Sequence, residues 1–513
     1  MMIFDSHTHF SAGAKPGAGR KLLEHAAACG IGGALVSHVL GFPAEPSSAE
    51  VRQANQFAAD ECAASPGRLF FFAYLNPQQP DWPEELERCR QSGAVGVKLW
   101  ISLKNQTGAL DNTVAVLRRA ATLDLPVLLH TFDRTDGNLR GEIGIAEFCQ
   151  MSREVPECRM VAAHLGCNWR RALHFIPQAS PNTYFDCCGT FPEKGMVREI
   201  LKVIPADRLL YGSDWPCRSF PSQLFKIREA GLSKEDADKI LWQNAIRLYR
   251  LPNPPDYPEV QLKPMPNELR TDHFCFCGDF PAGMPSGGTP AELESSLELH
   301  GIDMAMTVDA SSLFCKDICE ANRRFAAETE GLHRVRPLAI INPRASDVFQ
   351  TITDAAKYCA GLWFSPYFHA WQLNCATYAE IWKAAADTGL PVYINCGAGD
   401  YRVRPISPEV RPVSSEELCA FAALLPTGIR CCVQGFPGRI PADWPKTDAE
   451  LLWTAEHLSD YGSGDMGSVL AEQLSNDNGP QLVSGSEYPF RALNATSSIW
   501  LEIRQVMQNS SVE

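Results

Sequence analysis

The feature that most constrains the fold of this chain is an internal repeat. Four short phrases recur in the same order, each roughly 270 residues further along: ANQFAAD from Ala54 as ANRRFAAE from Ala321, FFFAYLNP ending at Pro77 as RPLAIINP ending at Pro343, LPVLLH from Leu125 as LPVYIN from Leu390, and YGSDWPCR from Tyr211 as SGSEYPFR from Ser484. Self-similarity at a nearly constant spacing is typical of a duplicated structural unit. The chain of 513 residues is long enough for two domains of ordinary size, so we predict a tandem duplication.

The first half of the chain alternates short apolar runs with segments of helical patterning. The runs are MIFD at the start, GGALVSHVL from Gly32, RLFFFAYLNP from Arg68, AVGVKLWI from Ala94, LPVLLHT from Leu125, RMVAAHLG from Arg159, TYFDCCG from Thr183 and RLLYGSDWP from Arg208. Helix-like segments lie at 47–64, 83–93 and 112–124, and a long one follows at 222–251. Eight strand and helix units in about 250 residues predict the α/β class and, within it, a (β/α)8 TIM-like barrel. A doubly wound open sheet is the alternative, but it gives no reason for polar residues to collect at so many strand ends.

A proline-rich stretch, PNPPDYPEVQLKPMPNE from Pro252, separates the two halves. It shows no helical or strand periodicity, which is typical of a linker. We therefore predict two tandem (β/α)8 barrels: a catalytic barrel at 1–252, a linker at 253–266 and a second, degenerate barrel at 267–513.

Composition and charge argue against several classes of partner. The chain carries 46 Lys plus Arg against 60 Asp plus Glu, a formal net charge of -14, which disfavours nucleic acid or an anionic membrane as the main partner. The sequence has no apolar run near the roughly 18 to 20 residues of a membrane span and no signal-peptide pattern at its N-terminus. Nineteen cysteines without a secretory signal indicate reduced thiols. We expect a cytoplasmic protein that acts on a small molecule, and make no prediction of its oligomeric state.

Polar residues that can carry chemistry follow the predicted strands of the first repeat. In DSHTHF, the side chains of Asp5, His7 and His9 would share one face of a strand, and two imidazoles with a carboxylate are typical zinc ligands. Further residues of this kind, at the ends of later predicted strands, are Lys98, His130, His164 and Asp214. Each alone has an ordinary interpretation as a core histidine, a surface lysine or a turn cap. Barrel enzymes build their sites at these strand ends, so one shared site explains the set better.

The order of these motifs resembles the amidohydrolase superfamily, in particular its amidohydrolase-related branch of metal-dependent hydrolases, lactonases and non-oxidative decarboxylases. The motifs are D-x-H-x-H, VGVKLW, LLHT, AAHLG and YGSDWP, closing on NAIRLYRL, and the resemblance covers residues 1 to about 251. It implies one divalent metal, with zinc favoured and manganese as the alternative. The implied ligands are His7, His9, His130 and Asp214, with His164 as general acid or base and Asp214 also as a proton acceptor. A divalent ion lowers the pKa of water and polarises carbonyl or carboxylate oxygens.

Other residues are predicted to contact the substrate. In binuclear members of the superfamily a lysine at the position of Lys98 is carboxylated and bridges two metals, whereas in mononuclear relatives it can bind substrate, and we favour the second role. Arg218 follows Asp214 in DWPCRSF and is a candidate clamp for a substrate carboxylate, because a guanidinium can engage it with two bonds. The weaker candidates, chosen from the end of the second strand and the polar loop after the fifth, are His38, Arg134 and Asn138.

The second repeat has lost most of these groups. The aligned positions are Asp272, Phe274, Phe276, Trp363, Asn395 and Glu487, with Gln434 or Gly435 near the place of His164. Two phenylalanines in place of the paired histidines would fill a metal pocket, so we expect this barrel to be non-catalytic. Cys275 and Cys277 alternate as thiolate ligands could, but strand parity turns them away from the site. Arg491 corresponds to Arg218 and could keep an anion-binding role.

The leading functional prediction is a metal-dependent hydrolase that acts on an amide, lactone or similar bond of a small, carboxylated molecule. Non-oxidative decarboxylation at the same metal site is the alternative reaction, and residue spacing does not separate the two because they share ligands. Metal-free lactone hydrolysis and a non-catalytic ligand-binding role are further alternatives.

Overall fold

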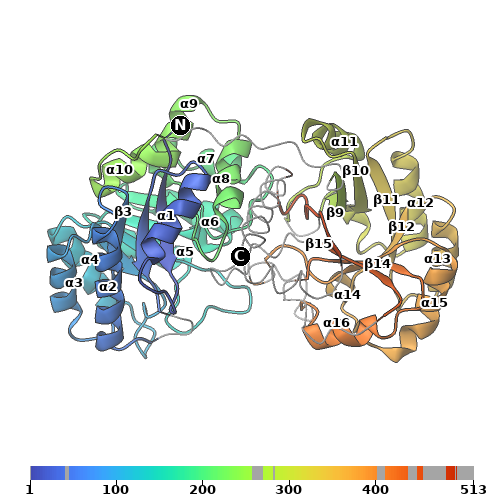
Figure 1. Ribbon diagram of the computed structural model, residues 1–513, viewed down its shortest axis with the longest axis horizontal. Coiled ribbons are helices and arrows are strands. Elements are labelled where there is room, and N and C mark those ends of the chain that lie inside the picture. Colours follow the sequence, from blue (N-terminus) through green and yellow to red (C-terminus); the bar gives the residue numbers. More distant parts are fainter. Residues whose placement is uncertain are drawn as a thin grey trace. The chain divides into compact units, whose positions relative to one another are not determined.

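The computed structural model describes residues 2–40, 45–256, 270–280, 284–400, 402, 411–436, 447–454, 481–491 and 493. The chain divides into two compact units, Met1–Thr190 with Gly195–Gln261, and Phe191–Lys194 with Leu262–Glu513. Each unit holds one sheet of eight strands (Figure 1). The fold is two tandem (β/α)8 barrels, as the repeat predicted. Most of the predicted linker at 253–266 lies outside the described residues.

The first barrel contains the strands that the apolar runs predicted. They are β1 (Phe4–Phe10), β2 (Gly33–His38), β3 (Leu69–Leu75), β4 (Gly96–Leu99), β5 (Val127–His130), β6 (Met160–Ala163), β7 (Thr183–Asp186) and β8 (Leu209–Leu210). Each strand pairs in parallel with the next along the chain. The N–H of Ser6 donates to the carbonyl of Tyr211 at 3.1 Å and that of His9 to Trp215 at 2.7 Å, which closes the ring of strands. This closure excludes the doubly wound alternative.

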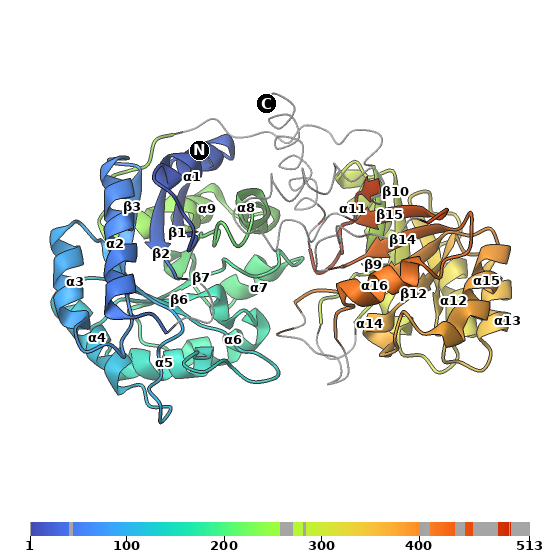
Figure 2. The same ribbon diagram turned by 60° about the horizontal axis from the view of Figure 1, so that its bottom comes forward.

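Helices connect these strands and cover the outside of the sheet (Figures 1 and 2). They are α1 (Ala18–Ala28), α2 (Ser48–Ala63), α3 (Trp82–Gln91), α4 (Asp111–Thr122), α5 (Ile145–Glu154), α6 (Trp169–Phe175), α7 (Met196–Leu201), α8 (Phe220–Glu229), α9 (Lys234–Asp238) and α10 (Asn244–Tyr249), with short turns η1 (His164–Gly166), η2 (Ile176–Gln178), η3 (Ala206–Arg208) and η4 (Lys239–Gln243). Outward-facing strand residues such as Val36 and Val97 pack with helix residues such as Phe148. The segment 222–251, predicted as one helix, is divided among α8, α9, η4 and α10, and the first break comes at Gly231, with a φ of 61°.

The inside of the first barrel is apolar at one end and polar at the other. The inward-facing apolar residues are Phe4, Leu35, Phe72, Leu128, Val161 and Leu210. Helix α10 adds Leu248 and Tyr249 to the same cluster. Alternate residues of a strand share a face, so positions two residues further along also point inward, and these include Ser37, His130 and Asp186. The polar end therefore lies at the carboxyl ends of the strands.

The second barrel repeats this order of elements. Its strands are β9 (Thr271–Cys277), β10 (Met304–Asp309), β11 (Val335–Ile341), β12 (Gly361–Phe364), β13 (Val392–Asn395), β14 (Arg430–Gln434), β15 (Glu450–Thr454) and β16 (Gln481–Val483), and its helices are α11 (Pro290–Leu299), α12 (Ile318–Glu328), α13 (Val348–Ala355), α14 (Pro366–His369), α15 (Ala379–Asp387) and α16 (Ser415–Ala422), with turns η6 (Ala310–Ser312) and η7 (Ala376–Tyr378). The N–H of His273 donates to Ser484 at 2.8 Å and that of Phe276 to Tyr488 at 2.9 Å, so the ring closes as in the first barrel. Among the helices described in either barrel, none is long and apolar enough to cross a membrane.

The interior of the second barrel is aromatic where that of the first is polar. One buried cluster contains Phe274, Phe276, Trp363, Tyr393 and Phe490. Polar side chains that remain bond to one another: Trp363 Nε1 donates to Gln434 Oε1 at 2.9 Å, and Arg491 Nε donates to Glu487 Oε2 at 2.9 Å. The two phenylalanines of β9 therefore occupy the barrel interior, as the aligned sequence predicted.

Strand register shows which residue stands in the place of His164. Ala163 lies opposite the end of β5, and Gln434 lies opposite the end of β13, so these two residues correspond. Gly435 then matches His164, and the two share a left-handed backbone, with φ of 63° and 66°. The second barrel has no side chain at the position of this histidine.

The alternating cysteines of the second barrel face outward. Cys275 and Cys277 pack with Leu293 and Leu297 of α11, in a cluster separate from that of Phe274. This is the orientation that strand parity predicted.

Candidate metal centre

Strand β1 directs two imidazoles toward one point. His7 and His9 are buried, and their Nε2 atoms lie 3.1 Å apart. His7 Nδ1 lies 2.8 Å from Asp186 Oδ2, and His9 Nδ1 lies 2.8 Å from Ser37 Oγ. A carboxylate only accepts, so the Nδ1 of His7 carries the proton of that bond. Partners at both Nδ1 atoms orient the rings and leave each Nε2 available as a ligand.

Asp5 lies outside this donor pair. The register of β1 shifts between Asp5 and Thr8, and the Asp5 carboxylate accepts the N–H groups of His7 and Ser213, each at 3.0 Å. Burial raises the pKa of Asp5 to about 7. Strand alternation therefore brings His7 and His9 together. Asp5 instead holds β1 to the segment after β8 through its hydrogen bond with Ser213.

Asp214 brings a carboxylate to the histidine pair. Its backbone has a φ of 65°, and its N–H donates to the His7 carbonyl at 2.8 Å. Asp214 Oδ1 lies 3.2 Å from His9 Nε2 and 3.9 Å from His7 Nε2. Ligand atoms in a tetrahedral site with bonds of about 2.0–2.1 Å are about 3.3 Å apart, close to these separations. The three donors therefore fit a divalent metal by chemistry and by spacing.

The charge states of these groups also suit a metal. Burial lowers the pKa of His9 to about 4, so its ring is neutral near pH 7. Burial acts to raise the pKa of Asp214, but His164 and His9 outweigh it and hold that pKa below its ordinary value. Neutral imidazole and ionised carboxylate are the forms that bind metals.

Lys98 lies against the same donors. Its Nζ is 2.9 Å from His7 Nε2, and the residue is 1% exposed. Burial lowers the pKa of Lys98, and the charge of Asp214 opposes that shift. The structure thus brings Lys98 to the histidine pair, a position that serves either of the roles predicted for it.

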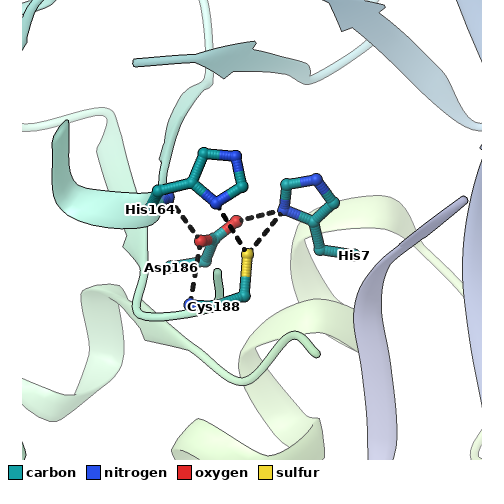
Figure 3. Close-up of side chains that lie close together, drawn as sticks. All are labelled: His7, His164, Asp186 and Cys188. Carbon is teal, nitrogen blue, oxygen red and sulfur yellow. Dashed lines mark hydrogen bonds and ion pairs between the residues drawn. The ribbon is translucent and has the colours of Figure 1, made fainter. Parts of the chain in front are cut away.

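A second group of donors faces the other nitrogen of His7 (Figure 3). Cys188 Sγ lies 2.9 Å from His7 Nδ1 and 3.2 Å from His164 Nδ1. Asp186 Oδ1 accepts the backbone N–H groups of His164 at 2.8 Å and of Cys188 at 3.2 Å. All four residues are buried, and their ligand atoms lie within 4.8 Å of one another.

Gly189 leaves room for both donor groups. A Cβ at this position would lie 2.4 Å from His164 Nδ1 and 3.0 Å from Asp214 Oδ2. Its φ of 68° also favours glycine. Any side chain here would enter the centre.

His130 lies beside the centre but is held by a different partner. Its ring centroid is 5.1 Å from that of His164, and its Nε2 lies 3.0 Å from Glu142 Oε1. Burial acts to raise the pKa of Glu142, but its bonds with His130 and Arg134 lower it to about 2. Among the described residues, neither group of close donors includes His130. The structure therefore shows the fourth ligand implied by the resemblance paired with a buried carboxylate.

Arg134 and Asn138 build the loop after β5. Asn138 Oδ1 accepts the N–H of Arg134 at 2.9 Å, and its Nδ2 donates to the Phe132 carbonyl at 2.5 Å. The Arg134 guanidinium lies 4.3 Å from the centre of the Phe132 ring and donates to Glu142 at 2.8 Å. Both side chains hold the loop, and substrate contact by either stays a prediction.

Arg218 contacts the backbone of Gly189, whereas His38 packs in the apolar layer outside the strands. Arg218 Nε donates to the Gly189 carbonyl at 3.2 Å, and the residue is 9% exposed. His38 packs against Phe10, which belongs to the apolar layer between sheet and helices. Ser37, one residue earlier, is the inward-facing residue at the end of β2.

Several residues of the centre were missed by sequence reasoning: Ser37, Glu142, Asp186, Cys188 and Gly189. The alternation that points Leu128 and His130 inward also points Ser37 and Asp186 inward, so the positions of Ser37 and Asp186 could have been predicted from the sequence. Cys188 and Gly189 follow the end of β7, where alternation no longer applies. Glu142 comes from the loop that follows β5, and its position depends on how that loop folds.

The first barrel matches a known protein family over nearly its whole length. Residues 4–251 match the family model described as amidohydrolase. The gamma-resorcylate decarboxylase of Polaromonas sp. (strain JS666 / ATCC BAA-500) is 25% identical over 248 residues, which covers 39% of this chain and 76% of that protein. The gamma-resorcylate decarboxylase of Rhizobium sp. (strain MTP-10005) is 26% identical over 248 residues, with the same 39% and 76% coverage. A crystal structure of 2,6-dihydroxybenzoate decarboxylase with 2,6-dihydroxybenzoate has 22% identity and a TM-score of 0.38, and the match covers 48% of this chain and 99% of that one.

The matched residues include both donor groups of the metal centre. The second barrel has the same order of strands with these donors replaced. The first barrel belongs to the amidohydrolase family, and the second is a degenerate copy of it.

Proposed function

We propose that the first barrel is a metal-dependent, non-oxidative decarboxylase of a small hydroxylated aromatic or unsaturated carboxylic acid. The observation that carries this proposal is the donor set at the carboxyl ends of the strands, formed by the buried His7 Nε2 and His9 Nε2 with the half-buried Asp214 Oδ1. Hydrolysis, the reaction favoured by the sequence, would use the same donors. Decarboxylation is preferred because the curated relatives named above are gamma-resorcylate decarboxylases.

The residues around the donor set suit an acidic substrate. Zinc or manganese held by the three donors would supply a Lewis acid for the substrate's carboxylate oxygens. Lys98 Nζ lies on the same side as these donors, 2.9 Å from His7 Nε2. Arg218 donates from Nε to the Gly189 carbonyl at 3.2 Å and from Nη1 to the Cys217 carbonyl at 2.9 Å, so it would act on a substrate carboxylate mainly through its charge. The Arg218 guanidinium and the Lys98 amine would orient the carboxylate that is lost.

Loss of carbon dioxide breaks a carbon–carbon bond and leaves its electron pair on the substrate, so a proton must reach that carbon. We assign this proton to His164, which lies with Asp214 beside Gly189. Burial lowers the pKa of His164 well below its usual value, and the charge of Asp214 opposes the shift. A bound anionic substrate would act in the same direction as Asp214 and raise that pKa. His164 would then hold a proton when an acid occupies the site.

The test is release of carbon dioxide by the full chain. Protein stripped of metal by a chelator, and the same protein with zinc or manganese restored, is supplied with 2,6-dihydroxybenzoate, other ortho-hydroxybenzoates and enoic acids. We expect release only with metal, and a loss of about 1,000-fold in His9→Ala, equivalent to about 4 kcal/mol of barrier. His174→Ala, at an exposed histidine of α6, is the matched control and should keep full activity.

Other outcomes would replace this proposal. Turnover of lactones or amides without carbon dioxide release would assign hydrolysis to the same donors. Release that does not need metal, or that survives His9→Ala, would contradict the metal role. Tight binding of these acids without turnover would assign the barrel to ligand binding.

A further inference from the structure

The ring of His7 is shared between two donor groups. Its Nε2 faces His9 and Asp214, and its Nδ1 faces Asp186 and Cys188. We propose that the second group is a cation position of its own, bridged to the first by the His7 ring, which takes a thiophilic divalent ion such as zinc. Its donor atoms are His7 Nδ1, His164 Nδ1, Asp186 Oδ2 and Cys188 Sγ. This inference goes beyond the decarboxylase proposal, which needs only the first position.

The four donors have the chemistry and the spacing of a zinc site. Two imidazole nitrogens, a carboxylate oxygen and a thiolate are typical zinc ligands. His7 Nδ1 lies 2.8 Å from Asp186 Oδ2 and 2.9 Å from Cys188 Sγ, which lies 3.2 Å from His164 Nδ1. Figure 3 shows the sulfur pointing toward both rings. The edges of a tetrahedral zinc site with these donors are about 3.3–3.6 Å, so binding would lengthen these three separations by a few tenths of an ångström.

The surrounding structure holds these donors and keeps water away. One oxygen of Asp186 accepts the backbone N–H groups of His164 and Cys188, which leaves the other oxygen directed at the group. None of the four donor residues is more than 4% exposed. The missing side chain of Gly189 keeps the space beside His164 Nδ1 open. The donors are therefore positioned before any ion binds.

Charge balance is satisfied when both positions are filled. Binding of the second ion displaces the thiol proton of Cys188 and the Nδ1 proton of His7, so two protons leave. The resulting thiolate and imidazolate join the carboxylates of Asp186 and Asp214, which gives four negative charges. Two divalent cations balance these four charges.

Cys187 provides a matched control for Cys188. It is also buried, but it packs in the apolar layer between sheet and helices, with its Sγ 3.9 Å from the Leu210 carbonyl. Replacing Cys187 removes a neighbouring thiol without removing a donor.

The experiment loads the full chain with cobalt(II), counts bound metal per chain by plasma mass spectrometry and records the cobalt–thiolate charge-transfer absorption. We expect two equivalents and the absorption band in the wild type and in Cys187→Ala. Cys188→Ala should bind one equivalent and lose the band. His9→Ala, which removes a donor of the first position, should bind one equivalent and keep the band.

In the wild type, one or two equivalents without the band would overturn the second position. If Cys188→Ala fails to fold, X-ray absorption of the zinc-loaded wild type decides the question, because sulfur in the zinc coordination shell is expected and its absence contradicts the proposal. These readouts report binding and not turnover. A protein that binds two ions and releases no carbon dioxide would contradict only the decarboxylase proposal.

Discussion

At the scale of single residues, Asp186 connects the parts of the candidate metal centre. Its carboxylate accepts three N–H groups, from the ring of His7 and from the backbone of His164 and Cys188. The first bond orients an imidazole of the candidate metal centre, and the other two fix the segments after β6 and β7. In the second barrel, the register of β14 and β15 places Thr454 at this position. The carboxylate is thus present only in the barrel that has the donors.

We expect Asp186→Asn to weaken manganese binding by about 10- to 100-fold. An amide presents an N–H group as well as an oxygen, so it cannot accept all three N–H donors. Competition against a chelator measures the affinity. Asp207→Asn, at an exposed carboxylate of the same barrel, should bind as the wild type does. Equal affinity in both variants would remove Asp186 from the centre.

Gly189→Ala should lower metal affinity at least tenfold while the barrel stays folded. The added Cβ would lie 2.4 Å from His164 Nδ1 and 3.0 Å from Asp214 Oδ2. Gly231→Ala separates this clash from backbone strain, because Gly231 has a similar φ of 61° and open space around its Cβ position. Both variants incur about 1–2 kcal/mol of left-handed strain. If metal titrations of the two variants coincide, the clash is not the cause.

At the scale of elements, β1 and β9 are each held by a buried aspartate that accepts two backbone N–H groups, an arrangement called the brace below. Asp272 Oδ1 accepts the N–H of Phe274 at 3.0 Å and of Ser486 at 2.8 Å, as Asp5 does for the matching amides of the first barrel. The brace persists in the barrel that lost its donors, so its role is structural. Loss of the acceptor would leave two buried N–H groups without a partner, at about 1–3 kcal/mol each.

The brace of β9 predicts a pH dependence of stability. Burial raises the pKa of Asp272 from 3.8 to about 6, so the folded carboxyl keeps its proton at a pH where the unfolded chain has lost it. Its contribution to stability is full below pH 4 and is lost as pH rises through 6, by at most about 3 kcal/mol. Asp272→Asn keeps an acceptor without titrating, so its stability relative to wild type should rise over this range. Hydrogen exchange of peptides covering β9 measures the difference, and a constant difference from pH 4 to 8 would contradict the shift.

Periodicity predicted most of the fold and part of the centre. Alternation in a strand depends on the backbone alone, so β5 and the inward position of His130 follow from LPVLLH. It failed at Asp5, where β1 shifts register without a signal in the sequence. Periodicity also could not place Cys188 or Gly189, because β7 ends before these residues. The path of the chain beyond β7 depends on tertiary contacts.

At the scale of the whole chain, both barrels keep the fold, but the residues of the candidate metal centre are kept in the first barrel and replaced in the second. Both barrels keep the order of eight strands and a left-handed residue after the eighth, Asp214 with a φ of 65° and Glu487 with 54°. Phe274 and Phe276 replace the paired histidines and pack in an aromatic cluster. Burying a phenylalanine side chain contributes about 1.5–3 kcal/mol, whereas a buried imidazole needs a polar partner. Within the part of the second barrel that the structure describes, the interior is packed like that of a stable domain and holds no group of close metal donors, and we predict that it binds no ion there.

The most direct test of this account is the location of the metal. Crystals of the full chain grown with manganese would give an anomalous-difference map at the manganese absorption edge. We predict a peak in the first barrel, about 2.0–2.3 Å from His7 Nε2, His9 Nε2 and the Asp214 carboxylate, and none beside Phe274 and Phe276. A peak inside the second barrel, or no peak at the three donors of the first, would contradict the account.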